Sequence, residues 1–315
     1  MTLLQVDQVK KKYKVKSFGK RYQLMAVNGV SFSVEKGTCV GLVGESGCGK
    51  STLGRIITGL EMPTEGRILI DGIFLEERKK MKSTKHIQMV FQDSFDAVNP
   101  RYTAKQIIEE PLRNRMKITA KEREEKVEEL LRQVGIPVSE KNKFALEFSG
   151  GQLQRVCIAR ALASDPDLIV LDEPLSSLDV SVQAQILNLL SDIKKERELS
   201  YLLISHDLEA VYYLSDAIIV MYGGQIMEKI DEIKYFDELI HPYTQRLLAA
   251  SSYQKKREKI CRKSDVTEIN IGIQKEGFVG CPYSGRCKRV TECCKYERPE
   301  IREIKKGHFV ACHQI

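Results

Sequence analysis

The 315-residue sequence contains no apolar run that approaches the length of about 18 residues needed to cross a bilayer as a helix. Its first residues, MTLLQVDQV, lack a basic segment followed by an apolar one, so we expect no secretory signal peptide. The sequence also has no internal repeat and no low-complexity tract. These absences favour a globular protein of the cytosol, where stable disulfides are rare.

A large excess of one charge is missing as well. Lys and Arg number 50 against 43 Asp and Glu, so the net charge of +7 is a mild imbalance that favours an ordinary mixed-charge surface over a nucleic-acid partner. Hydrophobic residues make up 42% of the chain, which is enough for a sizeable core. The length predicts one large domain, or one domain with a smaller attachment.

The first 80 residues favour short β-strands cut by glycine or charge, such as LLQVDQV, CVGLVG and RILIDG. A helix follows in TAKEREEKVEELLRQVGI, where Thr119 and Glu122 form a capping box and Gly135 ends the pattern. Apolar residues fall on one face of this helix at Val127, Leu130, Leu131 and Val134.

Three buried strands are predicted in the second half, at LIVLDEP, YLLISHD and AIIVMYGG, with helices between them. This alternation predicts a parallel α/β core. The stretch from Gln92 to about Asp165 is expected to form a separate helical layer. After about Tyr253 the sequence becomes charged, QKKREKICRK, which is typical of a linker, and a cysteine-rich tail follows.

The segment GLVGESGCGKST contains a complete phosphate-binding loop between an apolar strand and a helical pattern. Its glycines allow backbone N–H groups to converge on phosphate oxygens. Lys50 would reach the β- and γ-phosphates, and the Ser51 hydroxyl would bind Mg²⁺. Cys48 is interpreted as a small filler, with an oxidation-sensitive thiol as the alternative. The loop residues are Gly44, Glu45, Ser46, Gly47, Cys48, Gly49, Lys50 and Ser51.

The strand LIVLDEP ends in two carboxylates, Asp172 and Glu173. Ligands of open α/β sheets bind at the carboxyl ends of the strands, so both side chains are placed for chemistry. Asp172 could hold Mg²⁺ through water. Glu173 could orient and deprotonate an attacking water.

The segment FSGGQLQR places a hydroxyl and free N–H groups at the start of a helix, which suits an anion. Together with the phosphate loop before it and the Asp-Glu strand after it, the segment resembles the signature of the ATP-binding cassette (ABC) ATPases. The resemblance runs from about Leu4 to Ala250. It implies a P-loop NTPase cassette of α/β class, with a parallel-sheet core, an antiparallel β subdomain and an inserted helical subdomain at about 93–165. By the same resemblance the cassette spans 1–253, and a small Cys-rich extension spans 254–315.

The resemblance assigns roles to individual residues. Gln92 is the glutamine that senses Mg²⁺ and water and faces the membrane subunit, and His206 is the switch histidine at the γ-phosphate. Tyr13 would stack on adenine, with Tyr22 as the other candidate, and Thr52 joins the nucleotide-binding set. The signature that closes over ATP in a partner cassette is Ser149, Gly150, Gly151 and Gln152, followed by the D-loop residues Ser177, Leu178 and Asp179. Phe148 replaces a common Leu at an apolar packing position.

Further motifs narrow the resemblance. MAVNGVSFSVEKG, IQMVFQD, SLDVSVQAQILNLL and HPYTQRLL look like the oligopeptide/dipeptide/nickel importer subfamily, and most like its F-type subunit. Ser94 departs from the proline usual after the Q-loop, which loosens a turn but removes no catalytic group. The resemblance implies a cytoplasmic position at the membrane, a related D-type cassette, two membrane permeases and a solute-binding protein as partners, and no nucleic acid.

The mechanism implied by the resemblance is Mg²⁺-dependent ATP hydrolysis in a sandwich of two cassettes. Peptides are the expected cargo, and nickel or a metal chelate is the alternative. A soluble cassette ATPase acting on ribosomes or DNA is the rival from another class. Such proteins usually carry two cassettes or a long coiled-coil insertion, and this sequence has neither.

Five of the nine cysteines lie in the last 35 residues. The spacing of Cys281, Cys287, Cys294 and Cys312 is similar to the C-terminal extension of many subunits in the subfamily, some of which bind a [4Fe–4S] cluster. Four thiolates would also suit Zn²⁺, and free thiols are a third possibility. Cys293 adjoins Cys294 and could exchange with it as a ligand. A metal centre would stabilise a tail that has few apolar residues.

Overall fold

The computed structural model describes residues 1–17, 20–80, 87–115, 118–251 and 278–315. These residues form two compact units. The first contains Met1, Glu35–Thr38 and Glu76–Leu203, and the second contains Thr2–Val34, Cys39–Leu75 and Ile204–Ile315. The predicted linker, with Cys261, lies outside the described residues. Within the described ranges, no helix has both the length and the apolar character needed to cross a membrane.

The first unit contains parallel strands. Strand β6 (Ile87–Val90) pairs with β7 (Leu168–Asp172) in the register Ile87↔Leu168 to Val90↔Leu171, and β8 (Ser200–Ser205) follows β7 in the sheet. Every residue of β7 and β8 is buried, as expected for parallel strands covered on both faces. The predicted parallel α/β core is confirmed.

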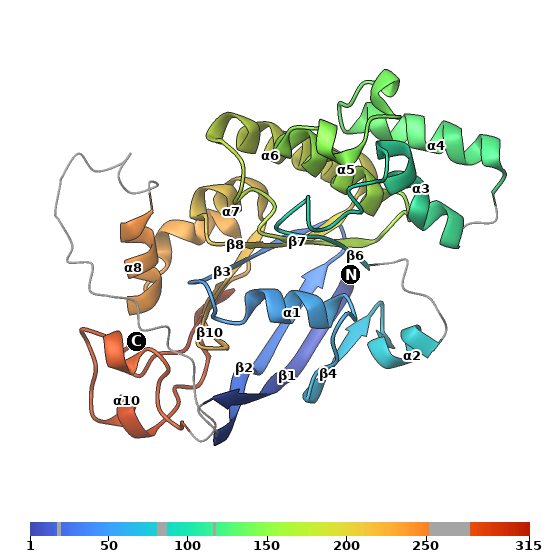
Figure 1. Cartoon of the computed structure of the whole chain (residues 1–315). Coiled ribbons are helices and arrows are strands. Elements are labelled where there is room, and N and C mark those ends of the chain that lie inside the picture. The colour runs from blue at the N-terminus through green and yellow to red at the C-terminus, as the bar shows by residue number, and fades with distance from the viewer. Residues whose placement is uncertain (18–19, 81–86, 116–117, 252–277) are drawn as a thin grey trace. The chain divides into compact units, whose positions relative to one another are not determined.

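Helices fill the rest of the first unit (Figure 1). They are α2 (Leu75–Lys80), α3 (Ala104–Arg115), α4 (Ala120–Gln133), α5 (Gly150–Leu162) and α6 (Val180–Arg197), with short 3-10 turns η1 (Val138–Glu140) and η2 (Ala145–Glu147). Thr119 caps α4 through the predicted box with Glu122, and the four predicted apolar residues of this segment are buried. Helix α3 packs on α4 and α5, in the same unit as β6 and β7.

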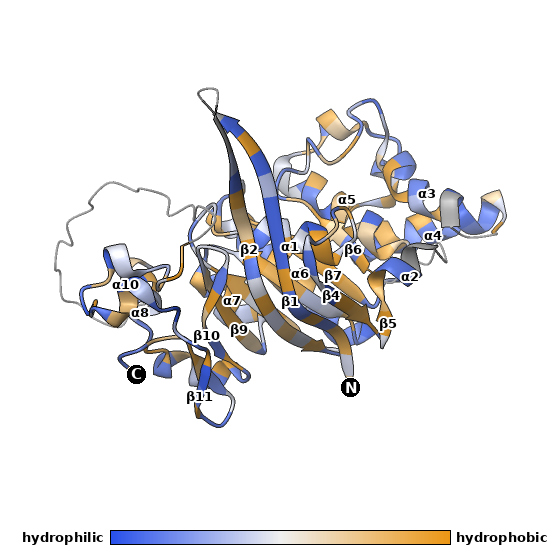
Figure 2. Ribbon diagram, turned by 90° about the horizontal axis from the view of Figure 1, so that it is seen from below, coloured by the Kyte–Doolittle hydropathy of each residue, from blue (hydrophilic) through white to orange (hydrophobic). Residues whose placement is uncertain are grey.

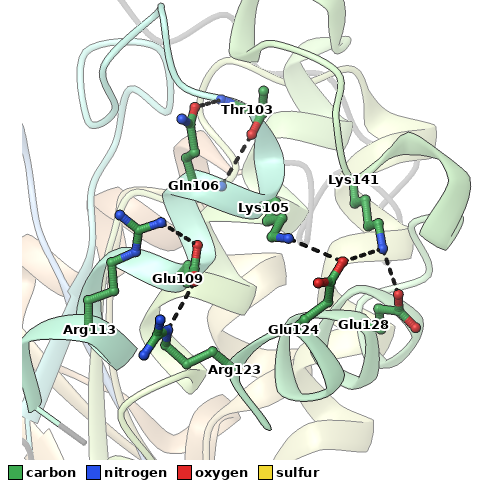
Figure 3. Close-up of polar contacts among 9 residues, drawn as sticks. All are labelled: Thr103, Lys105, Gln106, Glu109, Arg113, Arg123, Glu124, Glu128 and Lys141. Carbon is green, nitrogen blue, oxygen red and sulfur yellow. Dashed lines mark hydrogen bonds and ion pairs between the residues drawn. The ribbon is translucent and has the colours of Figure 1, made fainter. Parts of the chain in front are cut away.

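Ion pairs join α3 to α4, and α4 to the turn after it (Figure 3). The buried Glu109 accepts hydrogen bonds from Arg113 at 2.9 Å and from Arg123 at 3.0 Å. Lys141 binds both Glu124 and Glu128, at 2.8 and 2.7 Å. Burial alone would raise the pKa of Glu109, but its two arginine partners outweigh burial and lower it. This carboxylate is therefore charged and tied to two helices.

The second unit begins with an antiparallel sheet in the order β2 (Lys20–Glu35), β1 (Thr2–Ser17), β4 (Glu65–Ile70) and β5 (Ile73–Phe74). Hydrophilic and hydrophobic residues alternate along β1 and β2 (Figure 2). Such alternation is typical of strands with only one face buried. Both strands have 16 residues, much longer than the short strands expected from the sequence.

The second unit also contains five strands of the eight-stranded sheet, in the order β11 (Arg302–Lys305), β12 (His308–Val310), β10 (Gln225–Ile230), β9 (Ala217–Tyr222) and β3 (Cys39–Val43). Its helices and 3-10 turns are α1 (Lys50–Ile57), α7 (Leu208–Leu214), η3 (Ile233–Glu238), α8 (Pro242–Ala250), η4 (Ser284–Arg286) and α10 (Cys293–Tyr296). Strand β12 of the tail pairs antiparallel with β10. The tail therefore continues a sheet and buries Tyr283, Val310 and Ala311, which its low apolar content did not predict.

Candidate functional site

The phosphate loop leaves the buried strand β3 and enters α1 in the second unit. Gly49 has φ +104°, and a Cβ there would lie 2.1 Å from the carbonyl oxygen of Ala26, so only glycine fits. Cys48 packs against the same loop: a Cβ on Gly44 would lie 2.8 Å from its Sγ. Burial raises the pKa of Cys48, which is consistent with the predicted filler role. The backbone of the loop is thus closely packed at Gly44 and Gly49.

Lys50 is the first residue of α1, and its side chain is buried. The ammonium donates to the carbonyl oxygens of Gly44 at 2.7 Å and Glu45 at 3.1 Å, and it lies 3.8 Å from the Cys48 Sγ. These three contacts carry no full negative charge. A buried cation with such neighbours suits an anion such as phosphate.

Tyr13, on β1, is the predicted adenine platform. Its hydroxyl donates to the carboxylate of Glu61, which also accepts from Arg55 of α1 at 2.8 Å. The Lys11 ammonium lies 5.2 Å from the centre of the Tyr13 ring. Burial and the hydrogen bond to Glu61 raise the pKa of Tyr13, so the phenol is neutral. Tyr22, the other candidate, is exposed on β2.

In the first unit, Asp172 ends β7 and Glu173 follows it. Asp172 is 6% exposed, and Glu173 has φ +47°, in the left-handed region that glycine favours. A non-glycine residue in this region is uncommon and is often found at functional sites. Gln92 comes two residues after Val90 of the neighbouring parallel strand. Because Val90 lies opposite Leu171, Gln92 and Asp172 follow adjacent carboxyl ends of one sheet.

The predicted signature begins α5. The Ser149 hydroxyl accepts from the Gln152 N–H at 3.3 Å, and the Gln152 side chain accepts from the Ser149 N–H at 3.1 Å. A Cβ on Gly151 would lie 2.4 Å from Cγ1 of Val182, so this glycine lets α5 and α6 approach closely. Gly150 has more room, and Phe148 is buried, as expected at a packing position.

The predicted D-loop leads into α6 in the same unit. The Asp179 carboxylate accepts from the Val182 N–H at 3.0 Å and the Ser181 hydroxyl at 2.6 Å, and these bonds lower the pKa of Asp179. Asp179 is therefore a helix cap in this structure. His206 follows β8 in the second unit and is exposed. The predicted site residues are thus divided between the two units.

The four predicted ligand cysteines lie in the described tail, all as free thiols. The N–H of Cys281 donates to the carbonyl oxygen of Cys294 at 2.8 Å. Burial, and to a lesser degree the neighbouring Cys294, Cys312 and Cys287, raise the pKa of Cys281 to about 11. Cys281 therefore lies within electrostatic range of the other three thiols. Even so, no three His, Cys, Asp or Glu side chains in the described ranges form a group that could hold a metal ion.

Backbone N–H groups point at two of these sulfurs. Arg289 donates to the Cys287 Sγ and Gln314 to the Cys312 Sγ, each at 3.4 Å and each from two positions further along the chain. The Thr291 hydroxyl lies 3.1 Å from the Cys293 Sγ and 3.2 Å from the Cys294 Sγ. Such donors stabilise thiolates, which is the form that binds metals.

The sequence reasoning missed a buried polar cluster around HPYTQRLL. Glu228 of β10 is fully buried and accepts from the backbone of Ile240 at 2.7 Å and of His241 at 3.1 Å. The His308 ring nitrogen Nε2 lies 2.8 Å from the same carboxylate. Nor did the sequence predict that Tyr243 and Arg286 contact the phosphate loop at Glu45. In the sequence, HPYTQRLL was informative only as a mark of the subfamily.

Comparison with known proteins agrees with these motifs. A family model described as "ABC transporter" matches residues 27–176, and one described as "Oligopeptide/dipeptide transporter, C-terminal region" matches residues 227–294. The chain is 46% identical to the oligopeptide transport ATP-binding protein AppF of Bacillus subtilis (strain 168) and 43% identical to the dipeptide transport ATP-binding protein DppF of Haemophilus influenzae, each over 99% of this chain and 97% of the relative.

Among solved structures, the dimeric post-hydrolysis state of the ATP-binding cassette MJ0796 bound to ADP and phosphate is similar, with a TM-score of 0.65 and 30% identity. The match covers 72% of this chain and 97% of that one.

Proposed function

The chain belongs to the ABC transporter family, as an ATP-binding protein of its oligopeptide and dipeptide branch, and on that premise we propose that it hydrolyses ATP to drive the import of peptides. The likeness to peptide-transport ATP-binding proteins over the full chain, tail included, carries this proposal. The names of these relatives favour peptides over nickel or a metal chelate, and they give no support to a ribosome or DNA substrate.

The phosphate loop would bind the nucleotide. Lys50 would exchange its carbonyl contacts for phosphate oxygens, and the N–H groups at the start of α1 would add theirs. Tyr13 would stack on adenine, and its position beside α1 supports it over Tyr22. Ser51 lies in the first turn of α1, where its hydroxyl would be a Mg²⁺ ligand.

The remaining predicted site residues would complete the chemistry. Asp172 and Gln92, at adjacent strand ends, would be Mg²⁺ ligands, and the ion would neutralise charge on the phosphates. Glu173 would orient the attacking water and accept its proton, and His206 would contact the γ-phosphate. The left-handed backbone at Glu173 supports a functional role for this carboxylate.

We propose that a second cassette supplies the missing donors at the γ-phosphate through its own signature helix. The similar cassette MJ0796 forms a dimer in its post-hydrolysis state, which supports such an arrangement. In the complete importer the second cassette would be a related D-type subunit, joined by two membrane permeases and an extracytoplasmic solute-binding protein. The chain would then work at the cytoplasmic face of the membrane, with residues 1–253 as the cassette and 254–315 as the extension.

We also propose that Cys281, Cys287, Cys294 and Cys312 hold a [4Fe–4S] cluster. The electrostatic influence of the other three thiols on Cys281 and the N–H donors to two sulfurs support this ligand set. A tetrahedral Zn²⁺ would bring its thiolates to about 3.8 Å from one another, closer than a cluster that binds each thiolate at a different iron. Zn²⁺ is therefore the alternative, and iron and sulfide analysis of anaerobically purified protein decides between them.

The test is ATP hydrolysis by the assembled transporter. Glu173→Gln should keep ATP binding and slow turnover by about a hundredfold or more, the loss expected for a general base. Glu198→Gln is a matched control, because Glu198 has φ +50°, is exposed and lies at the end of α6. Turnover by the Glu173 variant at the wild-type rate would refute the assignment. Uptake with the cognate solute-binding protein, offered peptides or nickel, tests the cargo.

A further inference from the structure

Glu45, the second residue of the phosphate loop, is held at all three of its polar groups. Its carbonyl oxygen accepts from the Lys50 ammonium at 3.1 Å, and its N–H donates to the Tyr243 hydroxyl at 2.7 Å. Its carboxylate accepts two hydrogen bonds from Arg286, from Nη1 at 2.6 Å and from Nη2 at 3.0 Å. Two of these three partners come from the region after β10, far along the chain.

Arg286 makes the paired contact that a guanidinium and a carboxylate form most strongly. Both side chains are largely covered, with 22% and 29% of their surfaces exposed, so solvent screens the pair only in part. The guanidinium also lies 5.9 Å from the centre of the Tyr222 ring, with Nη1 3.4 Å from the Tyr222 hydroxyl. The Arg286 guanidinium is thus held by the Tyr222 ring as well as by the Glu45 carboxylate.

The backbone that carries Arg286 is a tight turn between two cysteines. The Ser284 N–H donates to the Cys281 carbonyl at 3.0 Å, and the Arg286 N–H donates to the Tyr283 carbonyl at 3.0 Å. Cys287 follows at once, and its N–H donates to the Ser284 carbonyl at 3.4 Å. The position of Arg286 therefore depends on how this cysteine-bounded turn is held.

Tyr243 approaches the loop from α8 and packs in an aromatic cluster. Its ring centre lies 4.7 Å from that of Tyr222 and 5.3 Å from that of Tyr283. Tyr283 itself belongs to the cysteine-bounded turn. Arg286 and Tyr243 therefore both contact Tyr222, and Tyr243 also packs on Tyr283 of the cysteine-bounded turn, so the two residues that hold Glu45 share their packing partners.

We infer that Arg286 is a positioning residue for the phosphate loop: it holds Glu45, with Tyr243, in the conformation that receives nucleotide, so the cysteine-rich extension sets the affinity of the cassette for ATP. This inference rests on the proposed role of the loop in nucleotide binding. Arg286 belongs to the extension and lies outside the recognised ATP motifs.

The physical reason is preorganisation. A loop that samples several conformations binds a ligand more weakly in proportion to the fraction of time it spends in the competent one. Removing Arg286 releases the Glu45 carboxylate, and the Tyr243 hydroxyl would still accept from the Glu45 N–H. Lys in place of Arg would keep the charge but lose the paired geometry, so it should restore part of the effect.

The test uses the full chain and a titration with a fluorescent ATP analogue and with ATP. Arg286→Met and Glu45→Ala should each weaken ATP binding by about five- to tenfold, and Arg286→Lys by less. The double variant should bind no more weakly than the weaker single variant, because both remove the same contact. In the assembled transporter the loss should fall on KM for ATP, with kcat at saturating ATP unchanged.

A matched control is Lys305→Met, because Lys305 also joins the extension to the cassette, through Glu238 at 2.7 Å, without touching the loop. It should keep wild-type ATP affinity. Wild-type affinity in Arg286→Met, or fully additive losses in the double variant, would overturn the inference. A loss in kcat alone would also overturn it.

Lys50→Ala separates this inference from the proposed function. If Lys50→Ala binds ATP normally, the loop assignment itself fails. If Lys50→Ala loses binding while Arg286→Met keeps it, only the role of Arg286 fails.

Discussion

Burial of His241 should make the folded protein less stable in acid. Its ring is buried, with 1% of the residue exposed, and burial lowers the pKa of His241 to about 4 despite a hydrogen bond with the Ala311 backbone. The ring nitrogen Nδ1 accepts from the Tyr243 N–H at 3.1 Å, at the start of α8. This nitrogen can accept only while it carries no proton.

The sign and size of the effect follow from linkage. Below pH 6.5 the unfolded chain gains a proton at this histidine, whereas the folded chain gains one only near pH 4. The unfolded state therefore binds more protons in this window, and stability falls as the pH falls from 6.5 towards 4. A pH of about 5 lies roughly 1.5 pH units below the pKa of the unfolded histidine. This difference corresponds to a loss of about 2 kcal/mol in the free energy of unfolding.

The measurement is urea unfolding of the wild type and His241→Gln at about pH 7.5 and about pH 5, followed by far-UV circular dichroism because the chain has no tryptophan. The wild type should lose about 2 kcal/mol more than the variant between the two conditions. His313→Gln is the control: this ring lies at an exposed contact with the Glu297 carbonyl oxygen, so its loss should leave the wild-type difference in place.

Carbon-13 NMR of the histidine rings tests the cause directly. The His241 signal should not titrate above about pH 5. A midpoint at or above about pH 6, or an equal loss of stability in His241→Gln, would refute the reasoning.

Three further outcomes are expected. Gly151→Ala should destabilise the first unit by about 1–3 kcal/mol through its clash with Val182, and adding Val182→Ala should restore much of the melting temperature. Glu109→Gln should cost about 1–3 kcal/mol of thermal stability, because two arginines lose a charged acceptor (Figure 3). Cys294→Ser should lower iron content and absorbance near about 400 nm, whereas Cys293→Ser should keep both; the reverse result would exchange the two as ligands.

Features set by near neighbours in the chain could be predicted from the sequence. The capping box of Thr119 and Glu122 depends on residues three apart, and the structure has it. In the phosphate loop, Lys50 likewise donates to the carbonyl oxygens of Gly44 and Glu45, a few positions earlier in the chain. Local patterns of this kind identify elements and motifs because the contacts they specify are short in sequence.

Contacts between distant segments could not be predicted in this way. Arg286 and Glu45 are 241 positions apart, and nothing in the spacing of the cysteines points to the loop. The pairing of the tail with β10 was missed because its few apolar residues suggested little core. The length of β1 and β2 was missed because lysines interrupt the apolar runs that mark a strand, although strands with one exposed face tolerate them.

The pairing of β12 with β10 has a consequence for synthesis of the chain. His308 lies opposite Ile230, so the partner of β10 leaves the ribosome about 80 residues later. At typical elongation rates that interval is about 4–16 s, during which β10 is an unprotected edge strand. Glu228 also lacks its histidine partner in that period. Newly made chains are therefore most prone to aggregate just before the extension arrives, and chaperones that shield strand edges would matter most then.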